Sequence, residues 1–357
     1  MKTKLLIGIL LVLGTITAQA QTLGELNTKL SHTQQKPSKK MPSKAYIASF
    51  NVLVEVYRED VDYKAKSSFR GKGRGEAKAM AALGLKGVNT EAIQAKVDAL
   101  YADFVSQLEN NGMEVLAGNV ASGTDYFKNA VVMEGPSLRE SANPGYIECI
   151  PSGATFYVSK REAEGKASKK DGFLSGFKAV GKALSGPNQL SKDLDDVLVI
   201  EVDLALNYSE AGSSWFKSIG AANAQIKTNL MLGTHTVAAP VKKGLRMKGQ
   251  ESTYRIPTRI GFYQGSGLKR VTSEGILKKP LYIGSVVENT KVSTYDKGKA
   301  STTYDIGNLY RVTEWRSSIS ENAKFVEVDG ERLADALYES SNAFLSDQIN
   351  QFFSFKK

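Results

Sequence analysis

The segment DGFLSGFKAVGKALSG, residues 171–186, comes nearest to a known chemical motif. Gly176, Gly181 and Lys182 have the spacing of the phosphate-binding loop G-x-x-x-x-G-K-[ST], in which backbone N–H groups and a lysine hold phosphates. Ala183 stands where that loop has the hydroxyl that binds Mg²⁺. The charged run KASKKD precedes the motif, where a phosphate loop needs a buried strand. The sequence therefore argues against a nucleotide, and we expect no cofactor.

The same segment has the pattern of a helix that lies on a membrane surface. Four apolar side chains share one helical face, and lysines flank it. Such a helix binds anionic lipid through its apolar stripe and its lysine charges together. A packed helix or a Gly/Ser-rich loop is the alternative, because each internal glycine weakens a helix by about 1 kcal/mol. The residues concerned are Phe173, Phe177, Val180 and Leu184, with Lys169, Lys170, Lys178 and Lys182.

A second basic stretch, Gly71-Lys-Gly-Arg-Gly75, lacks the dinucleotide-binding spacing G-x-G-x-x-G. It reads either as a flexible basic loop or as a site that binds anions or lipid headgroups. In the second case Arg70, Lys72 and Arg74 would make the contacts.

Residues for catalysis or metal binding are scarce. His32 and His235 are the two histidines and Cys149 is the single cysteine, too few for a His/Cys metal site. The sequence contains no G-x-S-x-G motif, which would mark a serine nucleophile. The adjacent pair Asp195-Asp196 is interpreted as charge at the edge of a loop. We expect His235 to lie at a strand end and Cys149 to be a small buried residue. The sequence predicts no metal and no enzyme.

The amino terminus and the charge indicate export to an anionic environment. Residues 1–20 combine Lys2 and Lys4, a short apolar run and Ala18-Gln19-Ala20, the pattern of a signal peptide. Gln21 stands where a lipoprotein has cysteine, so we expect no lipid anchor there. The net charge of +10 favours anionic surfaces such as lipid headgroups, lipopolysaccharide or polyanions; the alternative is that it serves only solubility. Localisation is expected to be periplasmic or secreted, with peripheral attachment to the outer membrane as one option.

Aromatic and basic residues alternate in STYRIPTRIGFYQGSGLKR, residues 252–270. Single-stranded nucleic-acid binders combine such residues as stacking platforms, but a half-exposed strand has the same pattern. Because the signal peptide predicts export from the cytoplasm, where nucleic acids are found, we expect no nucleic-acid partner.

Hydrophobic periodicity predicts an α+β fold with a mixed, largely antiparallel sheet. An amphipathic helix is expected near 90–110, between an Asn89 or Thr90 cap and an Asn111-Gly112 stop, and another near 329–353, capped by Asp329. Strands are expected at 45–57, 113–116, 154–160, 197–209, 222–232, 253–263, 281–295, 303–315 and 325–328. Alternation in 197–209 and 222–232 predicts an antiparallel pair with one polar face.

The predicted organisation has five parts. Residues 1–20 are the signal peptide, 21–44 a flexible leader and 45–160 a strand–helix–strand subdomain. A Gly/Lys-rich excursion covers 161–190, and a β-rich region with the C-terminal helix covers 191–357. One domain with a long excursion fits the pattern as well as two subdomains do.

Residues 45–118 and, more weakly, 196–232 resemble a bacterial envelope family. The strand at 45–57, the helix ending in LENNG and the strand MEVL resemble the periplasmic domain of the curli secretion channel and, less closely, TolB-type amino-terminal domains. The resemblance implies a non-enzymatic envelope protein that works through assembly or binding. Curli-channel proteins are lipoproteins, and Gln21 departs from that pattern.

Three functional hypotheses follow. The first is an exported envelope protein that acts in binding or assembly, at anionic membrane surfaces or with other envelope proteins or itself. The second is an oligomeric β-channel or secretion component, motivated by the alternating strands in 281–315; Lys291, Asp296, Arg311 and Glu314 count against it because lipid demands apolar side chains. The third is a hydrolase of unknown substrate.

Overall fold

The computed structural model describes residues 22–37, 41–64, 77–141, 143, 145–159, 186–211, 225–240, 251–265, 270–293 and 323–356. Its helices are α1 (Thr90–Asn110), α4 (Gly186–Asp193) and α6 (Gly330–Phe353), with 3-10 turns η1 (Gly118–Ala121), η2 (Asp125–Phe127) and η4 (Ser354–Lys356). Its strands are β1 (Thr22–Leu23), β2 (Thr28–Gln34), β3 (Lys44–Glu55), β4 (Tyr57–Lys64), β5 (Ala77–Lys86), β6 (Glu114–Val115), β7 (Ala130–Glu134), β8 (Ser137–Glu140), β9 (Tyr146–Ile150), β10 (Thr155–Ser159), β11 (Leu198–Ala211), β12 (Gln225–Leu232), β13 (His235–Pro240), β14 (Glu251–Ile256), β15 (Arg259–Gln264), β16 (Val271–Leu277), β17 (Leu281–Gly284), β18 (Lys291–Ser293) and β19 (Lys324–Glu327).

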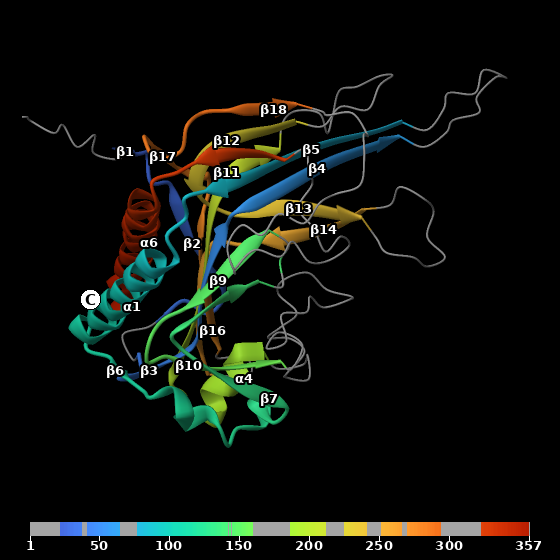
Figure 1. The fold of residues 1–357 in the computed structure, drawn as a ribbon. Helices are drawn as coiled ribbons and strands as arrows, with labels where there is room; N and C mark the ends of the chain where they lie inside the picture. The colour runs from blue at the N-terminus through green and yellow to red at the C-terminus, as the bar shows by residue number, and fades with distance from the viewer. Residues whose placement is uncertain are drawn as a thin grey trace, which may run out of the picture.

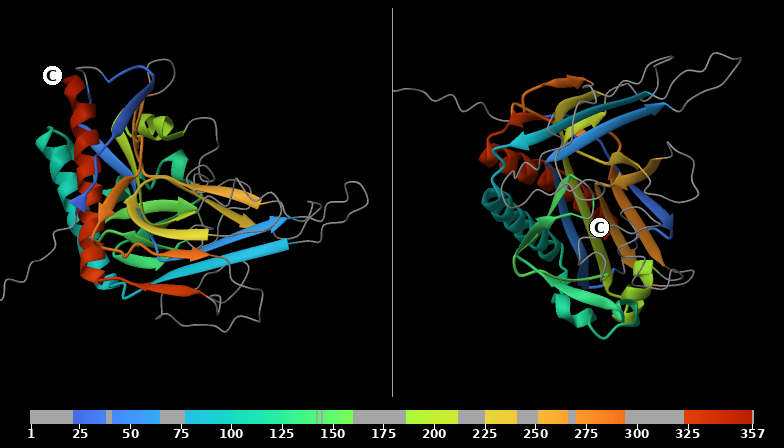
Figure 2. Two further views of the ribbon diagram at one scale, coloured as in Figure 1. Left: turned by 90° about the horizontal axis from the view of Figure 1, so that it is seen from above. Right: turned by 45° about the vertical axis from the view of Figure 1, so that its right-hand side comes forward.

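The fold is α+β, as the sequence predicts. A 12-stranded, largely antiparallel sheet runs in the order β1-β17-β12-β11-β15-β16-β2, with β3, β6, β8, β9 and β18 attached to it. Helices α1 and α6 lie side by side against one side of this sheet (Figures 1 and 2). Smaller sheets are formed by β7 with β10, by β13 with β14, and by β4, β5 and β19.

Strand β11 is the centre of the main sheet and changes neighbours along its length. It pairs in parallel with β3 as far as Leu206, and with β15 on its other side. Leu206 pairs with both Val54 of β3 and Leu232 of β12, so these two strands flank β11 on opposite edges. Beyond Leu206, β12 continues the pairing while β3 ends at Glu55. One edge of β11 is therefore left without β3 from Asn207 onward.

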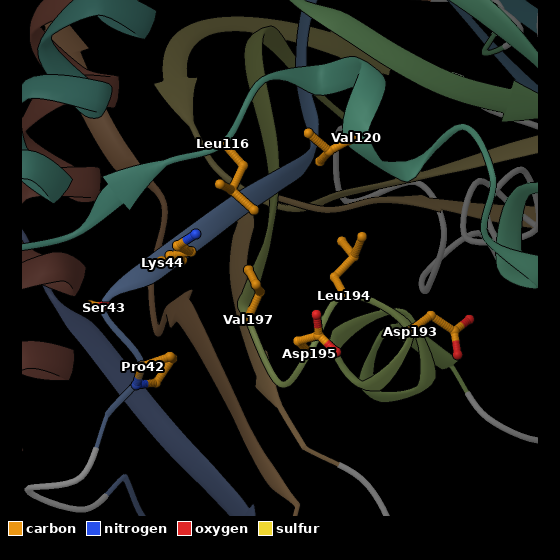
Figure 3. Close-up of a pocket in the computed structure, with 9 residues that line it drawn as sticks. All are labelled: Pro42, Ser43, Lys44, Leu116, Val120, Asp193, Leu194, Asp195 and Val197. Carbon is orange, nitrogen blue, oxygen red and sulfur yellow. The ribbon is translucent and has the colours of Figure 1, made fainter.

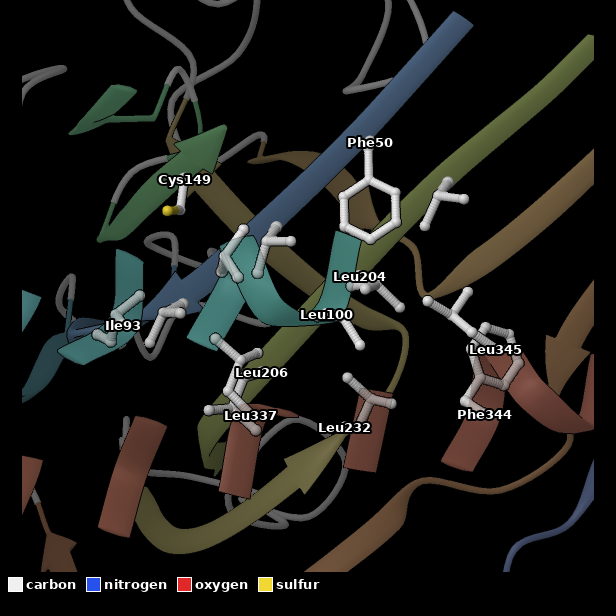
Figure 4. Packing of buried hydrophobic residues seen from close by; sticks show 14 of the residues in the cluster. Phe50, Ile93, Leu100, Cys149, Leu204, Leu206, Leu232, Leu337, Phe344 and Leu345 are labelled. Carbon is white, nitrogen blue, oxygen red and sulfur yellow. The ribbon is translucent and has the colours of Figure 1, made fainter. Parts of the chain in front are cut away.

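The main apolar core lies between the sheet and the two long helices. Phe50, Leu204, Leu206 and Leu232 of the strands face Leu100 of α1 and Leu337, Phe344 and Leu345 of α6 (Figure 4). Phe352 stacks on Phe262 with ring centroids 4.0 Å apart and planes 9° from parallel. Because the core joins residues of both predicted regions, 45–160 and 191–357, these regions share one sheet and one core.

Both long helices begin and end where their sequences indicate. Asn89 caps α1 by accepting from the N–H groups of Glu91 and Ala92. Gly112 follows α1 with φ of 78°, the left-handed conformation that glycine adopts readily. Asp329 caps α6 through the N–H groups of Glu331 and Arg332. The two predicted amphipathic helices are confirmed.

The prediction of a flexible leader over 21–44 is wrong for residues 22–23 and 28–34, which form strands. β1 pairs with β17, and β2 pairs with β16 along its whole length. Thr28 donates to Asp347 of α6 at 2.5 Å, and Gln351 donates to Thr28 at 2.9 Å. Polar, lysine-containing sequence forms an edge strand here because one side of the strand remains in water.

Two further expectations need correction. β11 pairs antiparallel with β12 as predicted, but its polar face is buried: Glu201 and Asp203 are each 4% exposed. The predicted strands 253–263 and 281–295 are each two strands, β14 with β15 and β17 with β18, because Pro257 interrupts the first and Ser285, with φ of 66°, follows β17 in the second. The prediction at 303–315 lies outside the described residues.

Several strands project from the body on the side opposite the helices. β4, β5, β13, β14, β12 and β18 all extend to the right in Figure 1, and Figure 2 shows the same arrangement from above. β4 and β5 are antiparallel partners, as are β13 and β14. We call these two the projecting strand pairs.

Core packing predicts a sharp contrast between two truncations. Phe352→Ala should lower the free energy of unfolding by about 3–5 kcal/mol, because it removes a ring that is 1% exposed and stacked on Phe262. Val132→Ala, at a side chain that is 53% exposed, should change it by less than about 0.5 kcal/mol. Urea unfolding measures both, and equal losses would show that α6 does not complete the core.

Candidate functional site

The sequence-predicted binding residues lie outside the described part of the chain. These are Lys169, Lys170, Phe173, Phe177, Lys178 and Lys182 of the first segment, with Arg70, Lys72 and Arg74 of the second. The elements that bracket them are described: β10 and α4 precede and follow residues 160–185, at the lower end of the molecule in Figure 1. β4 and β5 bracket residues 65–76 on the projecting side.

The sequence of the helix layer and the sequence of the segments that connect the projecting strands differ in charge. Helices α1 and α6 hold eight acidic residues and two basic ones. In contrast, residues 65–76 between β4 and β5 hold four basic residues and one acidic one, and residues 241–250 between β13 and β14 hold four basic and no acidic residues. The acidic residues of the helices are Glu91, Asp98, Asp103, Glu109, Glu331, Asp335, Glu339 and Asp347. The strands that bracket the basic segments thus leave the body opposite an acidic helix layer.

A cavity of about 510 Å³ lies at the opposite end of β11 from the point where β3 leaves it. Leu116, Val120, Leu194 and Val197 form an aliphatic wall, with Lys44 on one side and Asp195 on another (Figure 3). Pro42, Ser43 and Asp193 complete the lining. Lys44 is half exposed and lies 3.9 Å from Glu114. This lining holds no histidine or cysteine, and its charged groups are near water.

The main sheet buries a first network of charges. Arg259 of β15 donates to Asp203 at 2.8 Å and to Glu201 at 3.4 Å. Asn51 of β3 also donates to Asp203, at 3.0 Å. Burial raises the pKa of the Glu201 carboxyl, and the nearby Arg259 opposes that rise. The network satisfies the polar face of β11 inside the protein.

A second buried cluster occupies the place where β3 leaves β11. Glu55, the last residue of β3, has a fully buried side chain. Its carboxyl group accepts from the N–H groups of Tyr208 and Ser209 at 3.1 and 3.0 Å, and from the Ser209 hydroxyl at 2.9 Å. Glu55 therefore replaces the missing strand along this edge of β11. We call this cluster the joint, since it lies between the body and β4.

The joint contains a poorly satisfied cation. Arg58 of β4 is 6% exposed, and its Nη1 lies 3.6 Å from Glu55, close enough for an ion pair but beyond a hydrogen bond. Within the described residues its Nε and Nη1 have no hydrogen-bond partner. Burial raises the pKa of Glu55 to about 7, against the opposing effects of Arg58 and of the hydrogen bonds from β11.

His235, the first residue of β13, completes the joint. Its Nδ1 lies 3.1 Å from the hydroxyl of Tyr146 and 3.9 Å from Glu55. Burial and then the charge of Arg58 lower the pKa of His235 to about 3, so the ring is neutral in ordinary buffers. His235 is at a strand end, as predicted, but it faces a buried acid that the sequence did not reveal.

Backbone contacts tie the joint to both projecting strand pairs. The N–H groups of Val56 and Tyr57 donate to the carbonyl of Gly145 at 2.8 and 3.1 Å, which holds the turn from β3 into β4. The Tyr208 hydroxyl donates to the carbonyl of Leu83 in β5 at 2.6 Å. Since His235 begins β13, one cluster anchors β4, β5 and β13.

The remaining candidates have structural roles. Cys149 is buried and free, as predicted, and burial raises its pKa to about 12, which leaves an unreactive thiol. Asp195 and Asp196 both have φ near 60° in the connection between α4 and β11. In the described part of the chain no group of three His, Cys, Asp or Glu residues could hold a metal ion.

The residues that sequence reasoning missed are Glu55, Arg58, Tyr146, Glu201, Asp203 and Arg259. A signal for some of them was present, because Glu55, Glu201 and Asp203 interrupt apolar strand runs, VLVEVY and VLVIEVDLAL. A carboxylate inside such a run has to find a partner when both faces of the sheet are covered.

Comparison with family models, with curated proteins and with solved structures finds no match to this chain. Among the described residues, no helix is both long and apolar enough to cross a membrane.

Removing the guanidinium group of Arg259 from the first network should destabilise the folded protein. Arg259→Met leaves Glu201 and Asp203 buried without a counter-ion, and we expect the free energy of unfolding to fall by about 3–5 kcal/mol. The loss should be smaller at pH 5 than at pH 8, because Glu201, whose pKa is already raised, can take up a proton.

The control is Lys44→Met, which breaks an ion pair whose side chains are 51% and 64% exposed and should cost less than about 1 kcal/mol. Urea unfolding at the two pH values measures both variants. A loss for Arg259→Met no greater than that of the control would contradict a structural role for the network.

Proposed function

We propose that the protein is an exported, non-enzymatic cell-envelope protein that binds anionic membrane surfaces through the basic segments between its projecting strands. The separation of charge between the helix layer and the projecting strand pairs carries the proposal. Each lysine or arginine near an anionic surface contributes about 1 kcal/mol, and salt screens this attraction. An acidic helix layer facing away from the membrane would orient the molecule.

The basic segments divide into two groups by the elements that bracket them. Residues 65–76 and 241–250 start and end on projecting strands, so they are the first candidates for contact. The segment with Lys169, Lys170, Lys178 and Lys182 starts and ends at β10 and α4, in another part of the body. We therefore assign the main contribution to the projecting side and test the other segment separately.

Vesicle co-sedimentation tests this assignment. The parent should pellet with phosphatidylglycerol vesicles at low salt, remain in solution at high salt, and not bind neutral phosphatidylcholine vesicles. Changing Arg70, Lys72 and Arg74 to Gln should weaken binding by roughly 100-fold, at about 1 kcal/mol per charge. Changing Lys242, Lys243 and Arg246 to Gln should have a similar effect. Soluble lipopolysaccharide as competitor separates the two anionic surfaces.

The matched control removes three exposed lysines from the body, Lys29, Lys278 and Lys279, at one end of the β16–β2 pair. It should bind like the parent. If it weakens binding as much as the two projecting-side variants, only net charge matters and the assignment fails. The variant with Lys169, Lys170, Lys178 and Lys182 changed to Gln, together with Phe173→Ser and Phe177→Ser, shows whether that segment contributes.

An oligomeric β-channel or secretion component is the second candidate. It is favoured by the strands that leave the body together, and by β4, whose one strand neighbour within the described residues is β5. An unpaired strand edge is a template for pairing with another chain. Mass photometry after mild cross-linking in detergent distinguishes the two. We expect one small species, whereas a ring of many subunits would replace the first proposal with the second.

A further inference from the structure

The joint places three ionisable side chains of three different strands in one buried space. Glu55 ends β3, Arg58 lies in β4 and His235 begins β13. The hydroxyl of Tyr146 in β9 also faces this space, whereas that of Tyr208 in β11 donates to the carbonyl of Leu83. Burial raises the pKa of both tyrosines well above the ordinary value, so they stay neutral. The protonation state of the joint therefore depends on Glu55 and His235, because arginine keeps its charge.

Hydrogen bonding specifies how His235 is protonated. Asn207 donates through its amide nitrogen to the carbonyls of Gly233 and Ala205, at 2.9 and 3.2 Å, so its side-chain oxygen is free to accept. The Tyr146 hydroxyl donates to that oxygen at 2.7 Å. It has no second hydrogen, and therefore Nδ1–H of His235 must donate to the Tyr146 oxygen. A second proton would add a cation beside Arg58, in a space that already holds unpaired guanidinium N–H groups.

The carboxyl of Glu55 is the better place for a proton. As a carboxylate it would be fully buried, with its cation 3.6 Å away and not hydrogen-bonded to it. As a neutral acid it can still accept from the N–H groups of Tyr208 and Ser209. We propose that folding moves one proton within the pair of Glu55 and His235 under mildly acidic conditions: the folded protein carries on Glu55 the proton that the unfolded chain carries on His235.

The pH dependence follows from the direction of each change. The pKa of Glu55 is about 7 in the folded protein, against 4.5 ordinarily, so Glu55 adds stability as pH falls from 7 to 4.5. The pKa of His235 is about 3, against 6.5 ordinarily, so His235 removes stability as pH falls from 6.5 toward 3. Between about pH 4.5 and 6.5 the two effects cancel, because folded and unfolded chains each hold one proton on the pair.

Two single variants separate the effects. Relative to the parent, Glu55→Gln should lose about tenfold in the folded-to-unfolded ratio for each pH unit from 6.5 down to 4.5. His235→Gln should gain about tenfold per unit over the same range, since it no longer requires an imidazole to give up its proton. The double variant should run parallel to the parent. Differences from the parent cancel the titration of every other group, and urea unfolding at half-unit pH steps supplies the ratios.

Glu327→Gln is the matched control, because that carboxylate is 80% exposed beside Lys86; it should run parallel to the parent. Single variants that change in the same direction, or not at all, would overturn the proposal. If Glu55→Gln does not fold, NMR titration of the parent decides the same question. The Glu55 carboxyl should be protonated at pH 6 and the His235 ring neutral at pH 5, and an ionised Glu55 beside a protonated His235 at pH 6 would contradict the pair.

Discussion

The separation of β3 from β11 is the constraint on which the joint and the projecting strands depend. The two strands pair, with one register shift after Ile200, as far as Leu206 and Val54, and then β3 turns away into β4. Peptide groups left behind on β11 lie inside the protein, where an unpaired N–H costs about 1–3 kcal/mol. The carboxyl of Glu55 meets this requirement by accepting from Tyr208 and Ser209. A carboxyl-bearing residue at the end of an apolar strand thus ends one pairing and allows another sheet to begin.

Burial of β11 on both faces explains the second unusual feature of the core. An antiparallel sheet with helices on one side often exposes its other side to water. Here Glu201 and Asp203 lie on that other side and are nonetheless buried, so Arg259 and Asn51 have to satisfy them. Replacing one partner in such a network leaves an uncompensated charge, and the network therefore restricts which sequences can occupy β11, β15 and β3.

These constraints bear on function because they fix the direction of the projecting strands. β4, β5 and β13 share one buried anchor, so their connecting segments begin and end on one side of the molecule. Rigid strands present charge more precisely than a free tail would, and the acidic helices on the opposite side add to the separation of charge. This is the physical basis of our proposal that this side contacts a membrane.

The sequence by itself determined the fold class, both long helices with their caps, the β11–β12 pairing and the burial of Cys149, because periodicity and capping are local properties. It did not determine that 22–23 and 28–34 would form strands, since these polar strands are stabilised by β16, β17 and α6 rather than by their own residues. Nor did it predict that Glu55, Arg58 and His235 would form one cluster. The Glu55 carboxyl lies 3.6 Å from Arg58 and 3.9 Å from His235, although His235 is far from the other two in the chain. That proximity depends on how β3, β4 and β13 leave the main sheet, which only the tertiary structure decides.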